Sequence, residues 1–236
     1  MKQVGTPALA GTTRSAALNA RIKRDILTGN LEPGVRLPFA ELVATYNCSI
    51  GSLREVLQRL TELGLVDFVA QQGFRVVSVS AEDLQDLIEA RLEIEVAALR
   101  HSIVDGDLAW EAAAVAALHM LDGTPPLQEN NPDQFTEEWA AAHTRFHQAL
   151  LSGCKNRRLL SAAADLRHAA ELYRRWSIPF GADRHRDSQA EHHALLQAAV
   201  RRDVDEASKL LQHHISKTAY ILKPTLELNG RVPDSV

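Results

Sequence analysis

Four histidines are spaced so that their imidazoles could meet at one point inside a helical protein: His143, His147, His192 and His214. His143 and His147 are four residues apart in the sequence HTRFH, so both side chains lie on one face of a helix. The same face continues through apolar residues to Leu150, which predicts that it points inward. Neutral imidazole is the most common metal ligand in proteins, and several of them at one point are typical of a transition-metal site.

Each histidine alone has a simpler explanation, because a histidine on an apolar helix face is usually a hydrogen-bonded core residue. Only the combination, at inward positions of three predicted helices, favours a metal site. Two neighbours, His193 and His213, compete for the last two positions, but leucines three or four residues away share a helical face with His192 and His214. Ligation by histidine alone suits a divalent transition metal: we expect zinc first, with nickel, iron or copper as alternatives.

The composition is that of a globular protein, with 45% hydrophobic and 24% charged residues among 236. Only Cys48 and Cys154 are present, without CxxC spacing, which gives no basis for disulfides or a thiolate zinc site and fits a reducing compartment. No apolar run approaches the roughly 20 residues that span a bilayer, and the N-terminus has no signal-peptide pattern. We therefore expect a cytoplasmic protein with no membrane partner.

The charge is divided unevenly along the chain, although the net value is −4. Residues 1–78 contain nine Lys and Arg against six Asp and Glu, which gives +3, whereas residues 79–236 contain 17 against 24, which gives −7. A basic segment joined to a larger acidic one indicates that the first part binds a polyanion, although many solvated surfaces carry an equal excess.

Three short helices and a hairpin are predicted over residues 13–78, after a flexible tail over 1–12. Apolar residues recur at helical spacing from Leu18 to Leu27, and a Gly-Asn pair ends that helix. The turn LEPGVRL precedes a short helix, AELVATYN, and a third helix, SLREVLQRLTELG. Two β-rich runs around Gln72 and Gly73 form a hairpin. This order predicts a winged helix-turn-helix, whose third helix enters the DNA major groove while the hairpin approaches the backbone or the minor groove.

A second, helical domain is predicted over residues 79–223. The sequence from Ser80 to Asp83 resembles a capping box and opens a long helix. Amphipathic blocks follow over 107–121, 134–152, 156–176, 186–201 and 203–222, and turn signals at 123–126, 152–153 and 178–181 separate several of them. Because almost no β-rich segments occur, we expect an antiparallel bundle, a mainly α fold for the whole chain, and a frayed tail over 224–236.

Several motifs, in this order and spacing, resemble one family over nearly the whole chain: LEPGVRL, SIGSLREVLQRLTELGLV, QQGFRVV, DLIEARLEIE, FHQALLSG, EHHALLQA and LQHHI. Together they are similar to the GntR superfamily of bacterial transcription regulators, in its FadR-type subgroup with an FCD effector domain. The resemblance implies a homodimeric regulator of double-stranded operator DNA rather than an enzyme. It further implies a repressor that leaves its operator when a small carboxylate binds at a metal site in the helical domain.

In metal-binding members of this family, two ligands come from the region of the FH motif: its histidine and an aspartate or similar residue four positions earlier. The other two are the histidine of an EHxxxL motif and a histidine near the start of the last helical turns. Carried onto this chain, these positions are His143, His147, His192 and His214. His143 departs from the pattern, because a neutral side chain replaces the common aspartate. The site would therefore be more positive, which either strengthens attraction for an anionic effector or leaves one ligand position unused.

The resemblance also implies effector contacts. Arg91 matches the arginine of the family's VRxxLE stretch, and an arginine inside a bundle needs an anion because an unpaired buried charge is costly. That anion is either the effector or one of the nearby glutamates at positions 89, 93 and 95. Arg174 and Arg175 in LYRRW are weaker candidates for the same pocket.

The recognition helix departs from the family too. Many members read SRTPVRE, whereas this chain reads SIGSLRE, with Ile50 in place of a frequent base-contacting arginine. The change predicts a different operator, with apolar contact between Ile50 and a thymine methyl group. Arg54 is the strongest candidate for a base or phosphate contact, and a surface ion pair is its alternative role. The predicted DNA-binding residues are Arg36, Ser49, Ile50, Ser52, Arg54, Gln72 and Gly73.

Ile50 and the HTRFH motif together resemble the glutarate-responsive repressor branch of the family. Two rival functions stay open beside the ligand-responsive repressor. One is a metal-dependent hydrolase or oxygenase in a helical bundle, although neither HExxH nor paired ExxH motifs occur. The other is a regulator whose metal site is purely structural.

Overall fold

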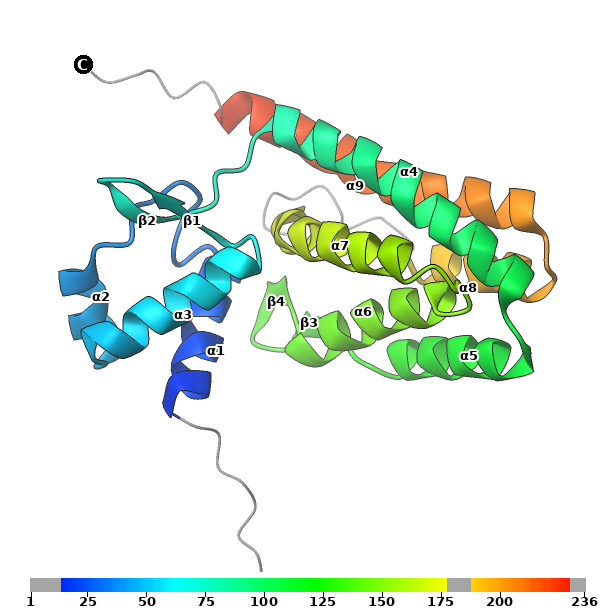
Figure 1. The fold of residues 1–236 in the computed structure, drawn as a ribbon, viewed down its shortest axis with the longest axis horizontal. Coiled ribbons are helices and arrows are strands. Elements are labelled where there is room, and N and C mark those ends of the chain that lie inside the picture. The colour runs from blue at the N-terminus through cyan, green and yellow to red at the C-terminus, as the bar shows by residue number, and fades with distance from the viewer. Residues whose placement is uncertain (1–13, 178–187, 230–236) are drawn as a thin grey trace, which may run out of the picture. The chain divides into compact units, whose positions relative to one another are not determined.

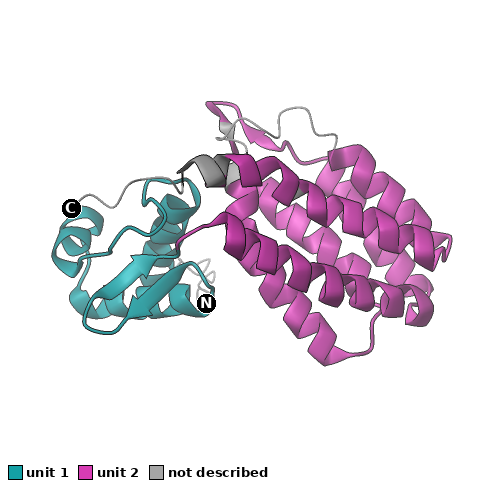
Figure 2. Cartoon of the chain, turned by 90° about the horizontal axis from the view of Figure 1, so that it is seen from above, with its two compact units in different colours: residues 1–77 teal, residues 78–236 magenta. Residues whose placement is uncertain are grey.

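The computed structural model describes residues 14–177 and 188–229 (Figure 1). The chain divides into two compact units, residues 1–77 and residues 78–236 (Figure 2). Unit 1 contains α1 (Arg14–Leu27), α2 (Phe39–Tyr46), α3 (Ile50–Glu62), β1 (Val66–Val69) and β2 (Gly73–Val76). Unit 2 contains α4 (Ala81–Asp105), α5 (Leu108–Asp122), β3 (Leu127–Gln128), β4 (Asn131–Phe135), α6 (Glu137–Leu151), α7 (Arg157–Ser177), α8 (Ser188–Val200) and α9 (Val204–Asn229). None of the helices among the described residues is long and apolar enough to cross a membrane.

Unit 1 has the winged helix-turn-helix architecture that the sequence predicts. Helix α3 packs against α1, α2 and β1, because its leucine and valine side chains recur on one face and are buried there. Ser49 caps this helix, since its Oγ accepts a hydrogen bond from the backbone N–H of Ser52. The other face of α3, including Ile50 and Arg54, stays exposed.

The wing is the antiparallel pair of β1 and β2, in which Asp67 lies opposite Arg75. The connecting turn contains two residues with positive φ, Gln71 at 65° and Gly73 at 86°. Arg36, which precedes α2, forms an isolated antiparallel bridge with Arg75 of β2. The backbone at Arg36 therefore pairs with the wing. Gly73 suits its position because a residue with a side chain is strained at such a φ.

Unit 2 is the predicted helical bundle (Figures 1 and 2). Helix α4 packs along α9 and α7, while α5 packs on α6 and α8 on α9. One continuous apolar core joins these helices, and its largest fully buried side chains include Leu99, Phe146 and Leu150. The predicted helical blocks therefore match α5 to α9 closely, since each block has an apolar stripe of helical period.

The structure corrects the expectation that unit 2 has almost no strands. A short hairpin, β3 with β4, occupies residues 127–135, where Pro132, together with Pro125 and Pro126 just before the hairpin, interrupts helical periodicity. Thr136 closes the hairpin, because its Oγ1 accepts from the backbone N–H of Trp139 and donates to the carbonyl of Pro125. Helix α6 consequently begins at Glu137 rather than at residue 134.

The frayed tail expected from residue 224 is also corrected, because α9 continues through Pro224 to Asn229. Leu222 and Leu226 are buried in the core on either side of this proline. Their packing continues the apolar stripe of the helix, so tertiary contacts outweigh the hydrogen bond that proline cannot make. The predicted tail over 1–12 and the predicted break at 178–181 lie outside the described residues.

The end of α6 is fixed by a close approach between α4 and the turn that follows α6. Ser102 on α4 donates its Oγ–H to the carbonyl of Leu150 at 2.8 Å and accepts from the N–H of Gly153 at 2.9 Å. A Cβ atom on Gly153 would lie 2.6 Å from the carbonyl oxygen of Ser102, so no larger residue fits without a shift. This junction anchors the helix that carries His143 and His147.

Candidate functional site

The four predicted histidines meet inside unit 2. His143 and His147 come from α6, His192 from α8 and His214 from α9, and one nitrogen of each ring lies within 4.8 Å of those of the others. Three of the side chains are buried, and His143 is partly exposed. The competing neighbour His193 is instead half-exposed and bonds to Asp122, so it lies away from the cluster.

Helix geometry explains why these residues converge. His143 and His147 occupy one face of α6, and that face points to the core that α8 and α9 also bury. His192 and His214 occupy the buried faces of α8 and α9, which pack against each other. Apolar neighbours at helical spacing therefore set the orientation of each imidazole.

Glu191 orients one of the four rings. Its Oε2 lies 2.9 Å from Nδ1 of His214, and its Oε1 accepts a hydrogen bond from Lys217 Nζ at 2.7 Å. A histidine that donates Nδ1–H to a carboxylate keeps the lone pair of Nε2 for a metal ion. Sequence reasoning missed Glu191, and its only signal was the EH pair in EHHALLQA.

His143 and His147 are held unprotonated, which is the form of histidine that binds a metal ion. Burial lowers the pKa of both His143 and His147 well below the ordinary value of 6.5, and the neighbouring imidazoles lower these pKa values further. Both rings are therefore neutral near pH 7 and each has a free lone pair. Within the described part of the chain, His147 Nε2 is buried with no hydrogen-bond partner, so the donor set fits a transition metal.

Two arginines on one side of the cluster share a single carboxylate. Arg91 Nε donates to Glu95 Oε1 at 2.6 Å, and Arg167 Nη1 lies 3.6 Å from Glu95 Oε2. Arg167 also donates to the backbone carbonyl of His147 at 3.4 Å. Both arginines help to lower the pKa of His147. Of the three glutamates that the sequence offered to Arg91, the partner is thus Glu95.

Sequence reasoning missed Arg167. Its signal was position, because Arg167 lies four residues after Ala163 and three before Ala170, both of which are buried on the inner face of α7. Burial lowers its pKa, while the Glu95 carboxylate opposes that effect.

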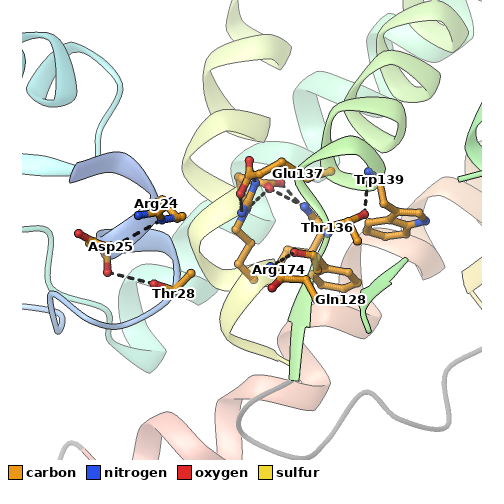
Figure 3. Close-up of polar contacts among 12 residues, drawn as sticks. Arg24, Asp25, Thr28, Gln128, Thr136, Glu137, Trp139 and Arg174 are labelled. Carbon is orange, nitrogen blue, oxygen red and sulfur yellow. Dashed lines mark hydrogen bonds and ion pairs between the residues drawn. The ribbon is translucent and has the colours of Figure 1, made fainter. Parts of the chain in front are cut away.

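The other two arginines predicted to bind the effector, Arg174 and Arg175, have different partners from Arg91. Arg174 bonds to Glu171, and its guanidinium lies over the rings of Phe135 and Trp139, 4.6 and 5.0 Å from their centroids. Arg174 and Trp139 are both labelled in Figure 3. Trp139 in turn stacks on His143, with 5.0 Å between ring centroids, so Arg174 borders the cluster through an aromatic layer.

Arg175 is balanced by two carboxylates. Its guanidinium donates to both oxygens of Glu137 and, through Nε, to Glu171 at 2.7 Å. These bonds raise the pKa of Arg175 against the opposing effect of burial. The arrangement ties the end of α7 to the start of α6 and gives Arg175 a structural role.

The predicted DNA-binding residues lie on two parts of unit 1. Ser49 and Ser52 bond to each other at the start of α3, next to Ile50, which is 59% exposed. Arg54 lies over the ring of Phe39, 5.2 Å from its centroid, and has no carboxylate within 4 Å among the described residues. On the wing, Arg36 donates to the amide oxygen of Gln72.

Comparisons with known proteins agree with this division of the chain. Residues 14–76 match the family described as "Bacterial regulatory proteins, gntR family", and residues 86–217 match the FCD domain. The chain belongs to the GntR family. A GntR-family regulator binds DNA to control transcription and is not an enzyme, so the hydrolase or oxygenase alternative is set aside.

Two relatives of this GntR chain are similar over most of their length. One is the HTH-type transcriptional regulator BphR of Paraburkholderia xenovorans, 33% identical over 203 residues, which are 86% of this chain and 82% of BphR. The other is the HTH-type transcriptional repressor GlaR of Escherichia coli, 30% identical over 212 residues, which are 88% of this chain and 95% of GlaR.

Among solved structures, E. coli McbR/YncC has the same fold, with a TM-score of 0.65 and 20% identity over 91% of this chain and 99% of that one. A GntR regulator from Rhodococcus has a TM-score of 0.62 and 24% identity over 89% of this chain and 98% of that one.

The buried histidines predict a pH effect on the metal-free protein. Their pKa values are lowered in the folded state but lie near 6.5 in the unfolded chain, so below about pH 6.5 the unfolded state binds protons that the folded state does not. We expect the free energy of unfolding to fall by about 1 kcal/mol for each histidine between pH 6.5 and 5.5, because the unfolded residue is half protonated at the upper limit and almost fully protonated at the lower. Urea titrations of EDTA-treated protein measure this, and His143→Gln should reduce the fall by about 1 kcal/mol, the contribution of one histidine. An unchanged fall in that variant would contradict the assignment.

Proposed function

We propose that this GntR-family protein is a homodimeric repressor that binds a divalent transition metal through His143, His147, His192 and His214. A small carboxylate binding beside the metal would release the protein from its operator. The observation that carries this proposal is the convergence of four imidazoles within 4.8 Å, three of them buried. The E. coli relative named as a repressor supports the direction of regulation.

The donor set favours zinc, with nickel, iron or copper as alternatives. All four ligands are neutral, so a bound divalent ion would keep its full positive charge and attract an anion to the site. Glu191 would hold His214 in the correct tautomer. His143, which takes the place of the family's common aspartate, is the residue that makes this site more positive.

Charge balance favours Arg91 and Arg167 as the effector's counter-ions. Two guanidiniums face one carboxylate, Glu95, and no second carboxylate lies within 4 Å of either among the described residues. Their side chains are each 11% exposed, and a buried excess of positive charge needs an anion. Arg174 and Arg175 have Glu171 and Glu137 as partners, so they are weaker candidates.

A thermal-shift screen with short mono- and dicarboxylates tests the proposal. The full-length protein is screened after zinc loading and again after EDTA treatment, and a DNA ligand selected from a random duplex library reports operator binding. We expect at least one acid to raise the melting temperature by several degrees only with zinc, and to weaken DNA binding about tenfold or more. By linkage, the same acid should bind the DNA complex less tightly by the same factor.

A matched pair of variants locates the carboxylate. Arg167→Gln should weaken the active acid about tenfold or more, because a charge-assisted bond in a buried site is lost. Arg145→Gln, at an exposed position on the same bundle, should bind it like the wild type. If no acid changes DNA affinity although zinc stabilises the protein, the metal is structural and the effector role is rejected.

A further inference from the structure

Two arginines on the wing are held side by side by one amide oxygen. Arg36 Nη2 donates to Gln72 Oε1 at 3.1 Å, and Arg75 Nη2 donates to the same oxygen at 2.8 Å. The backbones of Arg36 and Arg75 also face each other across an isolated antiparallel bridge. The two arginines therefore lie next to each other in the backbone, and both of their guanidinium groups bind the amide oxygen of Gln72.

The proximity of two cations is by itself unfavourable for folding. Like charges directly opposite each other on paired strands are destabilising. Among the described residues, neither Arg36 nor Arg75 has a carboxylate within 4 Å, although Asp67 lies opposite Arg75 in the strand register. The neutral amide of Gln72 links the two cations without cancelling their charge, so the cluster keeps a charge of +2.

The turn of the wing fixes Gln72 in this bridging position. The N–H of Gln72 bonds to the carbonyl of Val69 at 3.0 Å, and the residues on either side of it, Gln71 and Gly73, have positive φ. Its amide nitrogen donates to no group in the described part of the chain. Two guanidiniums and one amide thus present free N–H groups on an exposed surface of the DNA-binding unit.

We propose that Arg36, Gln72 and Arg75 form a clamp for the phosphodiester backbone of DNA. In this clamp Arg36 and Arg75 contact phosphate oxygens. Gln72 is a positioning residue, because its hydrogen bonds hold both guanidinium groups in place before DNA binds. Guanidinium groups match phosphate oxygens in charge and geometry, and holding them in place lowers the entropy lost on binding. The clamp rests on the DNA-binding function of the family. It adds Arg75 to the residues predicted from sequence and gives Gln72 a different role.

The salt dependence of DNA affinity separates phosphate contacts from base contacts. Each phosphate contact contributes about 0.9 to the slope of log K against log salt concentration for duplex DNA. Fluorescence anisotropy of the full-length protein with a 30-base-pair duplex of random sequence, from about 50 to 250 mM KCl, measures this slope without a known operator. Arg36→Gln and Arg75→Gln should each lower the slope by about 0.9 for each protomer that contacts the duplex, and weaken binding about five- to tenfold for each such contact near 100 mM salt.

Gln72→Met tests the positioning role, because methionine has a similar length but no amide. We expect it to weaken binding about threefold in the wild-type background and to have no further effect in the Arg75→Gln background. Additive losses would show that Gln72 acts independently of Arg75, which would overturn its assignment. All variants should melt within about 2 °C of the wild type, since Arg36 and Gln72 are exposed and Arg75 is only partly buried.

Arg201→Gln, at an exposed position in unit 2, is the control and should leave the slope unchanged. Normal slopes in both Arg36→Gln and Arg75→Gln would overturn the clamp while leaving the regulator function intact. Failure of the wild-type protein to bind duplex DNA at any salt concentration would instead contradict the proposed function itself.

Discussion

The His147→Ala protein is expected to lose its bound metal and to melt well below the wild type. His147 is 3% exposed and lies between His143, His192 and His214, so alanine removes a ligand and leaves a cavity. Truncating a buried side chain of this size costs about 2–4 kcal/mol, which corresponds to a fall of about 5–12 °C in a chain of this length. The stabilisation that the metal adds by binding only the folded state is lost as well. Elemental analysis and calorimetry measure the two effects.

His193→Ala is the matched control, because His193 is adjacent to His192 but is half-exposed and bonds to Asp122. It should keep the full metal content and a nearly unchanged melting temperature. EDTA should lower the melting temperature of the wild type and of His193→Ala, but hardly that of His147→Ala. A normal metal content in His147→Ala would reject His147 as a ligand.

The Arg54→Ala protein is expected to lose sequence-specific DNA binding about 30-fold or more without losing stability. Arg54 lies exposed on the leading turns of α3, and an arginine contact to a base contributes about 1–3 kcal/mol at each half-site. A dimer uses two half-sites, so the losses add. Within the described residues Arg54 has no ion pair, and its contact with Phe39 is a surface contact, so folding should depend little on it. Mobility shifts on a selected duplex and thermal melts test both parts.

Arg59→Ala is the control on the same helix, because Arg59 is exposed but pairs with Glu55. We expect a much smaller loss of DNA affinity in that variant, since the carboxylate already neutralises the guanidinium. A fall of more than about 5 °C in the melting temperature of Arg54→Ala would show that Arg54 is structural, and specific binding within threefold of the wild type would exclude it as a base contact.

Much of the fold could be predicted because local periodicity decides it. The buried faces of α3 and of the helices in unit 2 follow apolar residues at helical spacing, and caps such as Ser49 and Ser80 mark where helices begin. The β3–β4 hairpin and the end of α9 were mispredicted. In both places the prediction depends on a proline, which disfavours a helix. The observed structure depends instead on packing, as with Leu226, which is buried in the core.

The four histidines could be found from sequence for the same reason, because each lies on an inward helical face whose apolar neighbours fix its direction. The sequence alone therefore determined the two-part architecture, the family resemblance and the identity of the clustered imidazoles. Only the tertiary structure placed Arg167 against Glu95, Glu191 against His214 and Arg75 beside Arg36. These partners belong to different elements, and a contact between separate elements depends on how they pack, which the periodicity of a single segment does not encode.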